Sequence, residues 1–367
     1  MNIVLIVAEH GYSFVNQAEA LMKGLKQIGV NSSLVKVSGG HVDASQLQEA
    51  RPDIVISVGD WHDYAPLVEA PMVAGFVVVP WVVADEASDL WIEQYNKLPL
   101  ILVPSQHVKE QLTSNKVTDK LIEVLPEAVD DDLWKPWEEK RLVSFLELLS
   151  VQNEMIRADL PKRFDLMQAR QEGVPIIFTT GGYATAKGAQ EVMRALATLE
   201  EDLPWIYVIK TWPAIESLKY TQEELTLAEE LGLADRMRYI IGEFSRDFKV
   251  GLMNACDMYA SPSRHEGFGL PLVEAQMCGK PVVTVAGTAT QETVRDGVTG
   301  FLATRDTSAK DMRADVSSLA GHLRELLTNT DRRAELGRQA LKLARATYRP
   351  AAITRRLLNT LAKHKLP

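Results

Sequence analysis

Two glutamates flank a short glycine turn in the stretch SPSRHEGFGLPLVEAQMCGKPVV, residues 261–283. Seven residues separate Glu266 from Glu274, and they include two glycines and Pro271. Carboxylates accept hydrogen bonds from sugar hydroxyls, and glycine lets a ligand approach the backbone closely. Proline is favoured in the first turn of a helix, where free N–H groups attract anions. The spacing therefore predicts a site for a ligand with an anionic centre between two hydroxylated groups, which is the shape of a nucleotide-sugar.

The elements that position this turn form an alternating series of strands and helices. Apolar runs such as Ile3–Val7 are typical of strands buried on both faces of a parallel sheet, and Ala18, Leu21 and Leu25 share one face of the helix that follows. We expect further strands at residues 33–37, 53–58, 72–79, 100–103, 176–180, 205–209, 238–241, 258–260 and 281–285, and helices at 190–199, 225–231 and 312–361. The alternation predicts an α/β protein with doubly wound, Rossmann-like sheets, in which ligands bind at the carboxyl ends of the strands.

The chain is expected to divide near residue 130. The segment PEAVDDDLWKPWEEK, which starts at Pro126, is rich in proline, acid and tryptophan, as a linker is, and a new α/β series begins after it. We expect one Rossmann-like domain over residues 1–130, a second over residues 131–349 and a C-terminal helix over residues 350–367. The ligand would lie in the cleft between the two domains.

The composition argues against several classes of protein. The formal net charge of −9 and the lack of long basic runs argue against a nucleic-acid partner. Cys256 and Cys278 are the only cysteines and form no CxxC, which argues against a disulfide framework or a zinc site. The longest apolar run, Met72–Val83, is too short for a membrane span, and the first residues lack the features of a signal peptide. We expect a cytoplasmic protein.

The glycine turn and its surroundings carry a resemblance to a known family. Residues 261–302, with the Glu-x7-Glu spacing around EGFGLP, resemble the signature of family 4 glycosyltransferases, which have the GT-B fold of two Rossmann-like domains. Residues 103–109, 125–130 and 231–242 resemble further segments of that family. The resemblance implies a retaining hexosyl transfer in glycan biosynthesis, from a UDP- or GDP-sugar to a hydroxyl of a saccharide, lipid-linked or small-molecule acceptor. The N-terminal domain would bind the acceptor and the C-terminal domain the donor.

The resemblance also implies roles for individual residues. Glu266 would orient the donor sugar, Lys187 would balance the diphosphate, and His62, in GDWHD, is the candidate for the family's histidine near the acceptor. The residues expected at the donor are Gly181, Gly182, Lys187, Lys210, Ile241, Glu266, Gly267, Phe268, Gly269, Leu270 and Glu274. The family usually needs no metal at the diphosphate, and its C-terminal helix packs back on the N-terminal domain.

This chain departs from the family at the diphosphate. The family shows Gly-Arg, four residues, then Lys-Gly, whereas this chain reads GGYATAKG with Gly182 in place of the arginine. Losing a fixed cation should weaken stabilisation of a phosphate leaving group. We expect Lys210, at the end of a predicted strand, to compensate, with Arg264 as a second candidate. His10, in the first loop, is a further histidine without an assigned role.

Three alternatives stay open from the sequence. A nucleotide-sugar epimerase shares the two-domain fold, and Gly182 would also suit a binding module that kept the donor site but lost turnover. The basic C-terminal tail, which includes Arg355, Arg356 and Lys363, would serve either as a solvated helix or for peripheral contact with a membrane or an acceptor. Release of nucleoside diphosphate in the presence of an acceptor separates the transferase from the other two activities.

Overall fold

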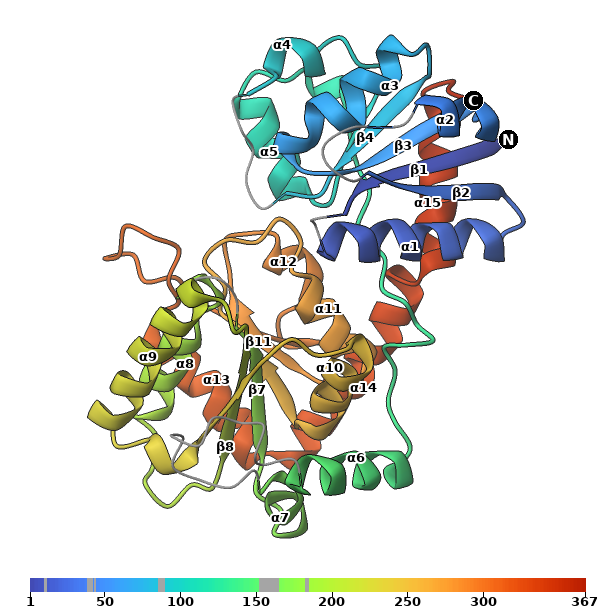
Figure 1. Cartoon of the computed structure of the whole chain (residues 1–367). Coiled ribbons are helices and arrows are strands. Elements are labelled where there is room, and N and C mark those ends of the chain that lie inside the picture. Colours follow the sequence, from blue (N-terminus) through green and yellow to red (C-terminus); the bar gives the residue numbers. More distant parts are fainter. Residues whose placement is uncertain (10–11, 38–41, 43, 85–89, 152–164, 182–184) are drawn as a thin grey trace. The chain divides into compact units, whose positions relative to one another are not determined.

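The computed structural model describes residues 1–9, 12–37, 42, 44–84, 90–151, 165–181 and 185–367. The chain forms two compact units. Unit 1 comprises residues 1–131, 266–270 and 345–367, and unit 2 comprises residues 132–265 and 271–344. Each unit is built on a parallel sheet of six strands with helices packed against it (Figure 1). The α/β fold class with two Rossmann-like sheets, predicted from the alternating pattern, is confirmed.

The sheet of unit 1 has the strand order β2-β1-β3-β4-β5-β6. Its strands are β1 (Asn2–Ala8), β2 (Asn31–Val37), β3 (Ile54–Gly59), β4 (Val78–Val82), β5 (Ile101–Val103) and β6 (Ile122–Val124). Along β1, Ile3 and Leu5 enter one hydrophobic core, whereas Val4 and Ile6 enter another on the opposite face. Successive side chains of a strand point to opposite faces, so a strand covered on both sides must be apolar throughout.

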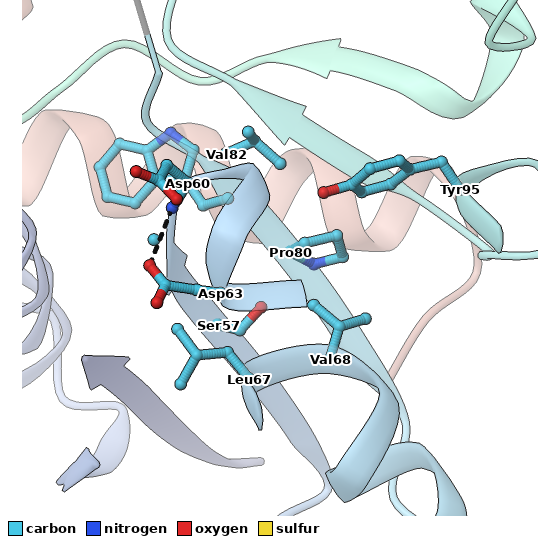
Figure 2. Close-up of a pocket in the computed structure, with 10 residues that line it drawn as sticks. Ser57, Asp60, Asp63, Leu67, Val68, Pro80, Val82 and Tyr95 are labelled. Carbon is cyan, nitrogen blue, oxygen red and sulfur yellow. Dashed lines mark hydrogen bonds between the residues drawn. The ribbon is translucent and has the colours of Figure 1, made fainter. Parts of the chain in front are cut away.

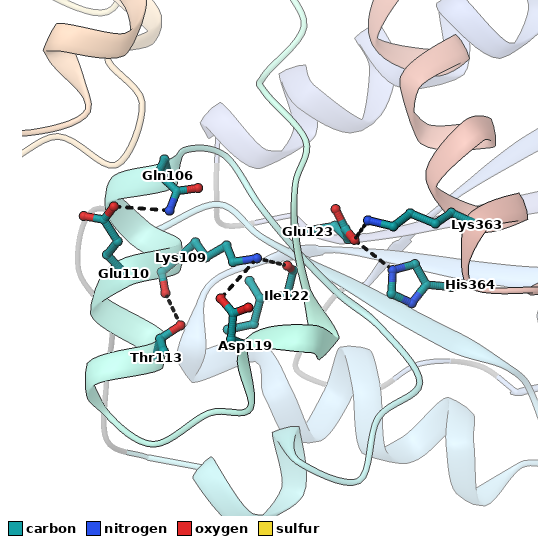
Figure 3. Close-up of polar contacts among 9 residues, drawn as sticks. All are labelled: Gln106, Lys109, Glu110, Thr113, Asp119, Ile122, Glu123, Lys363 and His364. Atoms are coloured by element: carbon teal, nitrogen blue, oxygen red, sulfur yellow. Dashed lines mark hydrogen bonds and ion pairs between the residues drawn. The ribbon is translucent and has the colours of Figure 1, made fainter.

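Helices of unit 1 come from both ends of the chain. They are α1 (Tyr12–Gln27), α2 (Ala44–Ala50), α3 (Ala70–Val73), α4 (Ile92–Tyr95), α5 (Gln106–Ser114) and α15 (Pro350–Lys363). The C-terminal helix α15 packs on α1, where Gly24 has no room for a Cβ beside the Pro350 carbonyl. Its last turn is tied to β6, because Lys363 and His364 lie 2.6 and 3.0 Å from the Glu123 carboxylate (Figure 3).

The sheet of unit 2 has the strand order β12-β11-β10-β7-β8-β9. Its strands are β7 (Ile176–Thr180), β8 (Ile206–Thr211), β9 (Met237–Ile241), β10 (Met258–Ala260), β11 (Val282–Val285) and β12 (Gly300–Ala303). The helices between residues 139 and 347 are α6 (Glu139–Val151), α7 (Leu166–Gln171), α8 (Ala189–Leu196), α9 (Ile215–Glu230), α10 (Arg246–Ala255), α11 (Leu270–Met277), α12 (Thr290–Thr293), α13 (Val316–Thr328) and α14 (Thr330–Thr347). Numbered from β7, this is the order 3-2-1-4-5-6 of dinucleotide-binding sheets.

One predicted strand is wrong. The apolar run at residues 72–79 is split between the end of α3 and the start of β4, with Gly75 between them at φ +92°. A short apolar run does not distinguish a buried strand from a buried helix, and the left-handed glycine ends the helix before the chain enters the sheet. The helix expected at 225–231 is only the second half of α9, and the tail helix is interrupted at Asn329 as well as before Pro350.

No helix in the described part of the chain combines the length and the apolar character of a membrane span.

Candidate functional site

The predicted site segments of unit 2 follow two neighbouring strands at the point where the strand order reverses. β7 pairs with β8 on one side and β10 on the other, so the chain winds outward in both directions from these strands. Ligands of doubly wound sheets bind outside the carboxyl ends of the strands at this switch point. Gly181 follows β7, and the loop that starts at Ser261 follows β10 and leads to α11. Sequence and topology therefore indicate the same edge of the sheet.

The turn that carries Lys187 is held against the loop after β10. The hydroxyl of Ser261 donates to the Lys187 carbonyl at 3.1 Å. The hydroxyl of Ser263 and the amide of Arg264 both donate to the Ala186 carbonyl, at 3.1 and 2.8 Å. These bonds join two segments about 75 residues apart in sequence. The backbone of Lys187 is thus fixed beside the switch point, by contacts that do not involve the lysine side chain.

Gly188 makes the close approach of these two segments feasible, whereas Gly181 joins two strand ends. Gly188 lies in the left-handed region at φ +77°, and a Cβ there would collide with the Pro262 carbonyl. Gly181 donates its amide hydrogen to the Lys210 carbonyl at 2.7 Å, which joins the ends of β7 and β8. Gly182, the position expected to hold an arginine in the family, lies outside the described residues.

Lys210 is fully buried near the end of β8. Its Nζ has no hydrogen-bond partner among the described residues and lies 3.4 Å from the centre of the Trp212 ring. Burial lowers the pKa of Lys210 to about 8; the nearby Lys249 acts in the same direction and Glu243 opposes it. The structure therefore places an amine without a hydrogen-bonded carboxylate at the edge where an anionic ligand is expected.

Arg264, the second candidate to replace the missing arginine, has a different environment. It is buried, and its guanidinium lies 2.5 Å from Glu191 and 3.4 Å from Asp311. Two carboxylates thus balance its charge, and it links the loop after β10 to α8. Arg264 is therefore paired with carboxylates, whereas the Lys210 amine has no such hydrogen-bonded partner among the described residues.

Glu274 lies in α11, one turn after the helix begins, as the spacing predicted. Burial raises its pKa to about 7, while Lys249 and Arg246, both on α10, act in the opposite direction. Neither cation was predicted as a site residue. The only signal available in the sequence was their i, i+3 spacing at the start of the helix that follows β9. Because Lys249 acts on both Lys210 and Glu274, these three side chains belong to one group.

The glycine turn itself is grouped with unit 1 rather than with the residues above. Glu266 and Phe268 are both buried, and Phe268 packs edge to face on Tyr348, with ring centres 5.6 Å apart. Gly269 has φ +87°, a conformation that favours glycine. Gly267 and Leu270 complete this segment of residues 266–270. In unit 2, Ile241 is the last residue of β9 and is half-buried.

His62 lies at the corresponding edge of unit 1. β1 and β3 are the neighbouring strands at the switch point of this sheet, and β3 ends at Gly59, directly before the turn Trp61–Asp63. Asp60 caps this turn, and its carboxylate lies 3.2 Å from the His62 Nδ1. The His62 side chain is 81% exposed, so a ligand could reach it directly. His10 lies outside the described residues.

The turn that carries His62 is held in place by contacts of the buried Trp61 with other aromatic side chains. The Trp61 ring packs edge to face on Tyr95, and the Trp61 carbonyl accepts a hydrogen bond from the Trp91 indole at 3.1 Å. A cavity beside the turn is lined by Ser57, Gly59, Asp60, Asp63, Leu67, Val68, Pro80, Trp81, Val82 and Tyr95 (Figure 2). Its volume of about 10 Å³ suits a single water molecule and no sugar.

Comparison with known proteins identifies the domain that contains most of these residues. Residues 166–343 match the family model of the glycosyl transferases group 1. The D-inositol 3-phosphate glycosyltransferase of Salinispora tropica is 32% identical over 194 residues, which are 52% of this chain and 36% of that protein. The enzyme of the same name from Mycolicibacterium gilvum is 38% identical over 128 residues, 35% of this chain and 28% of that protein. The matches thus span about a third of the length of these curated relatives.

Solved structures extend the likeness to the whole fold. Anabaena HepE in complex with UDP superimposes with a TM-score of 0.73 at 18% identity, over 99% of this chain and all of that one. A glycosyltransferase from Rickettsia africae superimposes with a TM-score of 0.76 at 16% identity, over 99% of this chain and 98% of that one. At such low identity these structures establish the fold alone. Residues 166–343 are therefore similar to group 1 glycosyltransferase domains, and the chain has the GT-B fold that was predicted from its glycine turn.

Proposed function

We propose that this protein is a retaining hexosyltransferase that moves a sugar from a nucleotide-sugar to an acceptor hydroxyl. The proposal is supported by the group of Lys210, Lys249 and Glu274, which lies with the Lys187 turn at the switch point of unit 2, in a region that matches the group 1 glycosyltransferase model. The solved complexes of HepE with UDP and with UDP-glucose support a UDP-sugar as the first donor to test.

The proposed donor contacts follow from charge and position. Lys187 and Lys210 balance the diphosphate, and the N-terminus of α11 adds partial positive charge. Glu274 accepts hydrogen bonds from the ribose diol, and Glu266 orients the donor sugar. The backbone amides of residues 267–270 face the sugar and the phosphates, and Gly181 and Ile241 border the nucleotide. With two lysines at the diphosphate, we propose that the reaction needs no divalent metal.

The proposed chemistry occurs on one face of the sugar. The bond between the anomeric carbon and the diphosphate oxygen breaks as the acceptor oxygen attacks from the same side, and the acceptor proton passes to the leaving diphosphate. The protein contributes position and charge rather than a base. His62, exposed at the edge of unit 1, contacts the acceptor. A saccharide, a lipid-linked sugar and a small molecule are the acceptor classes, in the cytoplasm or at the inner face of the membrane.

The experiment measures nucleoside diphosphate release from UDP-glucose and GDP-mannose, with and without a panel of saccharide and polyol acceptors. The proposal expects release that depends on an acceptor, with the sugar recovered on that acceptor. Lys187→Ala should lower the rate of release about 10²–10³-fold, whereas Lys342→Ala, which removes an exposed lysine of the same unit, should not change it. Interconversion of the donor without release would instead identify an epimerase. Binding without turnover of any donor would identify a degenerate binding module, which the Gly182 departure favours.

A further inference from the structure

Lys210 and Trp212 form a pair that the family signature does not include. The Lys210 amine lies 3.4 Å from the centre of the Trp212 ring, and its side chain is fully buried. A buried ammonium without a hydrogen-bonded partner is unfavourable. The face of an indole ring is the best of the aromatic faces at stabilising a cation. The indole therefore supplies the stabilisation that a carboxylate would otherwise provide.

Charged groups on the neighbouring elements do not neutralise Lys210. Lys249, on α10, repels it, and Glu243, after β9, attracts it. On α11, Glu274 faces Lys249 and Arg246. Within the described part of the chain, none of these carboxylates forms a hydrogen bond with the Lys210 amine.

We infer that Trp212 is a positioning residue, whose indole face keeps the Lys210 ammonium charged and in place at the carboxyl end of β8 for the diphosphate of a nucleotide ligand. This inference rests on the proposed donor site. An ammonium carries three N–H donors. One can face the ring while the others bond to phosphate oxygens, once the ligand displaces the atoms that cover the Lys210 amine in the free protein. The Lys210–Trp212 pair thereby supplies the fixed cation that this chain lacks at Gly182.

Binding of a diphosphate beside Lys210 should depend on pH. Burial lowers the pKa of Lys210 to about 8, so a diphosphate should bind less well as the pH rises through 8 and the amine loses its charge. Without the indole face, the charged form loses its stabilisation and the pKa falls further. The loss of affinity should then begin about one pH unit lower, as expected for an interaction of the usual cation–π strength.

The test measures the dissociation constant of UDP by calorimetry between pH 6.5 and 9 for the wild type and four variants. ADP and GDP are run in parallel. Lys210→Met should weaken binding about tenfold at pH 7 and remove the fall above pH 8. Trp212→Leu should move that fall to lower pH, and Trp212→Phe, which keeps an aromatic face, should move it less. Trp137→Leu is the matched control, because it removes another indole of unit 2 that lies 3.9 Å from a guanidinium, that of Arg141. It should leave the profile unchanged.

Each outcome decides the inference. Comparison of variants at the same pH cancels the ionisation of the ligand itself. A Trp212→Leu profile identical to that of the wild type overturns the role of Trp212 while leaving the donor site intact. Equal shifts for the leucine and phenylalanine variants show that packing alone is involved. If Trp212→Leu does not fold, as judged by circular dichroism, the phenylalanine variant decides: a fall in affinity that begins at lower pH than in the wild type supports the inference, and an unchanged profile overturns it. If no nucleotide binds the wild type at millimolar concentration, both this inference and the proposed function fail.

Discussion

The carboxyl edges of the two sheets differ in charge although both sheets are parallel and six-stranded. The edge of unit 2 brings Lys210 and Lys249 beside Glu274, whereas the edge of unit 1 presents Asp60 and His62. The strand orders place a switch point in both units, so each sheet has one position that suits a bound ligand. From the side chains at each location, the proposed function assigns an anionic ligand to unit 2 and a hydroxylated acceptor to unit 1.

Burial sharpens this difference. Lys210 is 0% exposed, whereas the His62 side chain is 81% exposed. Electrostatic interactions are stronger where water is excluded. Substitution of Lys210 should therefore change the affinity for an anionic ligand strongly. Substitution of His62 should change binding only once an acceptor excludes water from its side chain.

The largest expected effect is on kcat/KM and UDP affinity when one residue is removed from each of the two edges. Lys187→Ala should lower kcat/KM about 10²–10³-fold, because it removes a fixed cation from the leaving group, and should also weaken UDP binding. His62→Ala should lower turnover with an acceptor but leave the UDP dissociation constant unchanged. Steady-state rates and calorimetry on both variants provide the measurement. Equal loss of UDP affinity in the two variants contradicts the division of roles.

A second prediction compares two glycines with the same backbone conformation. Gly188 and Gly29 both have φ +77°, but a Cβ collides with the Pro262 carbonyl at Gly188 and has open space at Gly29. Gly29→Ala should cost about 1 kcal/mol of unfolding free energy, and Gly188→Ala about 3 kcal/mol or more, with loss of the UDP response. Urea unfolding measures both. Similar costs would show that the Lys187 turn tolerates displacement.

The third prediction uses the ionisation of Glu274. Burial raises its pKa to about 7, so the side chain is neutral below that pH and charged above it. A carboxylate binds a diol more strongly than the neutral acid does, so UDP affinity relative to Glu274→Gln should improve about tenfold between pH 6 and 8. Calorimetry at both pH values measures this ratio. A ratio that does not change with pH removes Glu274 from the diol contact.

The free energy of unfolding should change with pH in the opposite direction to UDP affinity when the wild type is compared with Glu274→Gln. A carboxyl group with a raised pKa in the folded state loses stability as the pH rises from its unfolded value through 7. Glu274→Gln should therefore be more stable than the wild type at pH 8, and the difference should shrink toward pH 5. Thermal unfolding at both pH values checks the sign.

The smallest expected effect lies at the tail of unit 1. Although burial favours the neutral acid, hydrogen bonds from Lys363 and His364 hold the pKa of Glu123 below its ordinary value. The stability from this contact is present above the ordinary carboxyl pKa and is lost as the pH falls through the lowered one. Glu123→Gln should cost less than about 1 kcal/mol at pH 7, because exposed ion pairs contribute little. Urea unfolding at pH 7 and pH 3.5 tests this, and a larger cost would show that α15 depends on this contact.

Much of the fold follows from local patterns. The strands at β1, β7 and β10 and the start of α11 were predicted within a residue or two, because buried strands need continuous apolar runs and helices need a defined first turn. The error at residues 72–79 has a physical reason. The run is apolar throughout, and only Gly75, in a left-handed conformation, separates helix from strand.

Within the candidate site, Glu266, Glu274 and Lys187 could be singled out from the sequence, because each lies in a short local motif. The residues that begin the helix with Glu274 lie in the same motif. The sequence by itself thus determined the two sheets, the glycine turn and its resemblance to the signature of family 4 glycosyltransferases. Only the tertiary structure decided that Trp212 faces Lys210, that Lys249 and Arg246 act on Glu274, and that Glu191 balances Arg264. Most of these pairs join residues from separate helices, strands and loops. Their contacts and their burial depend on the strand order and helix packing of the folded chain, and no local sequence pattern predicts them.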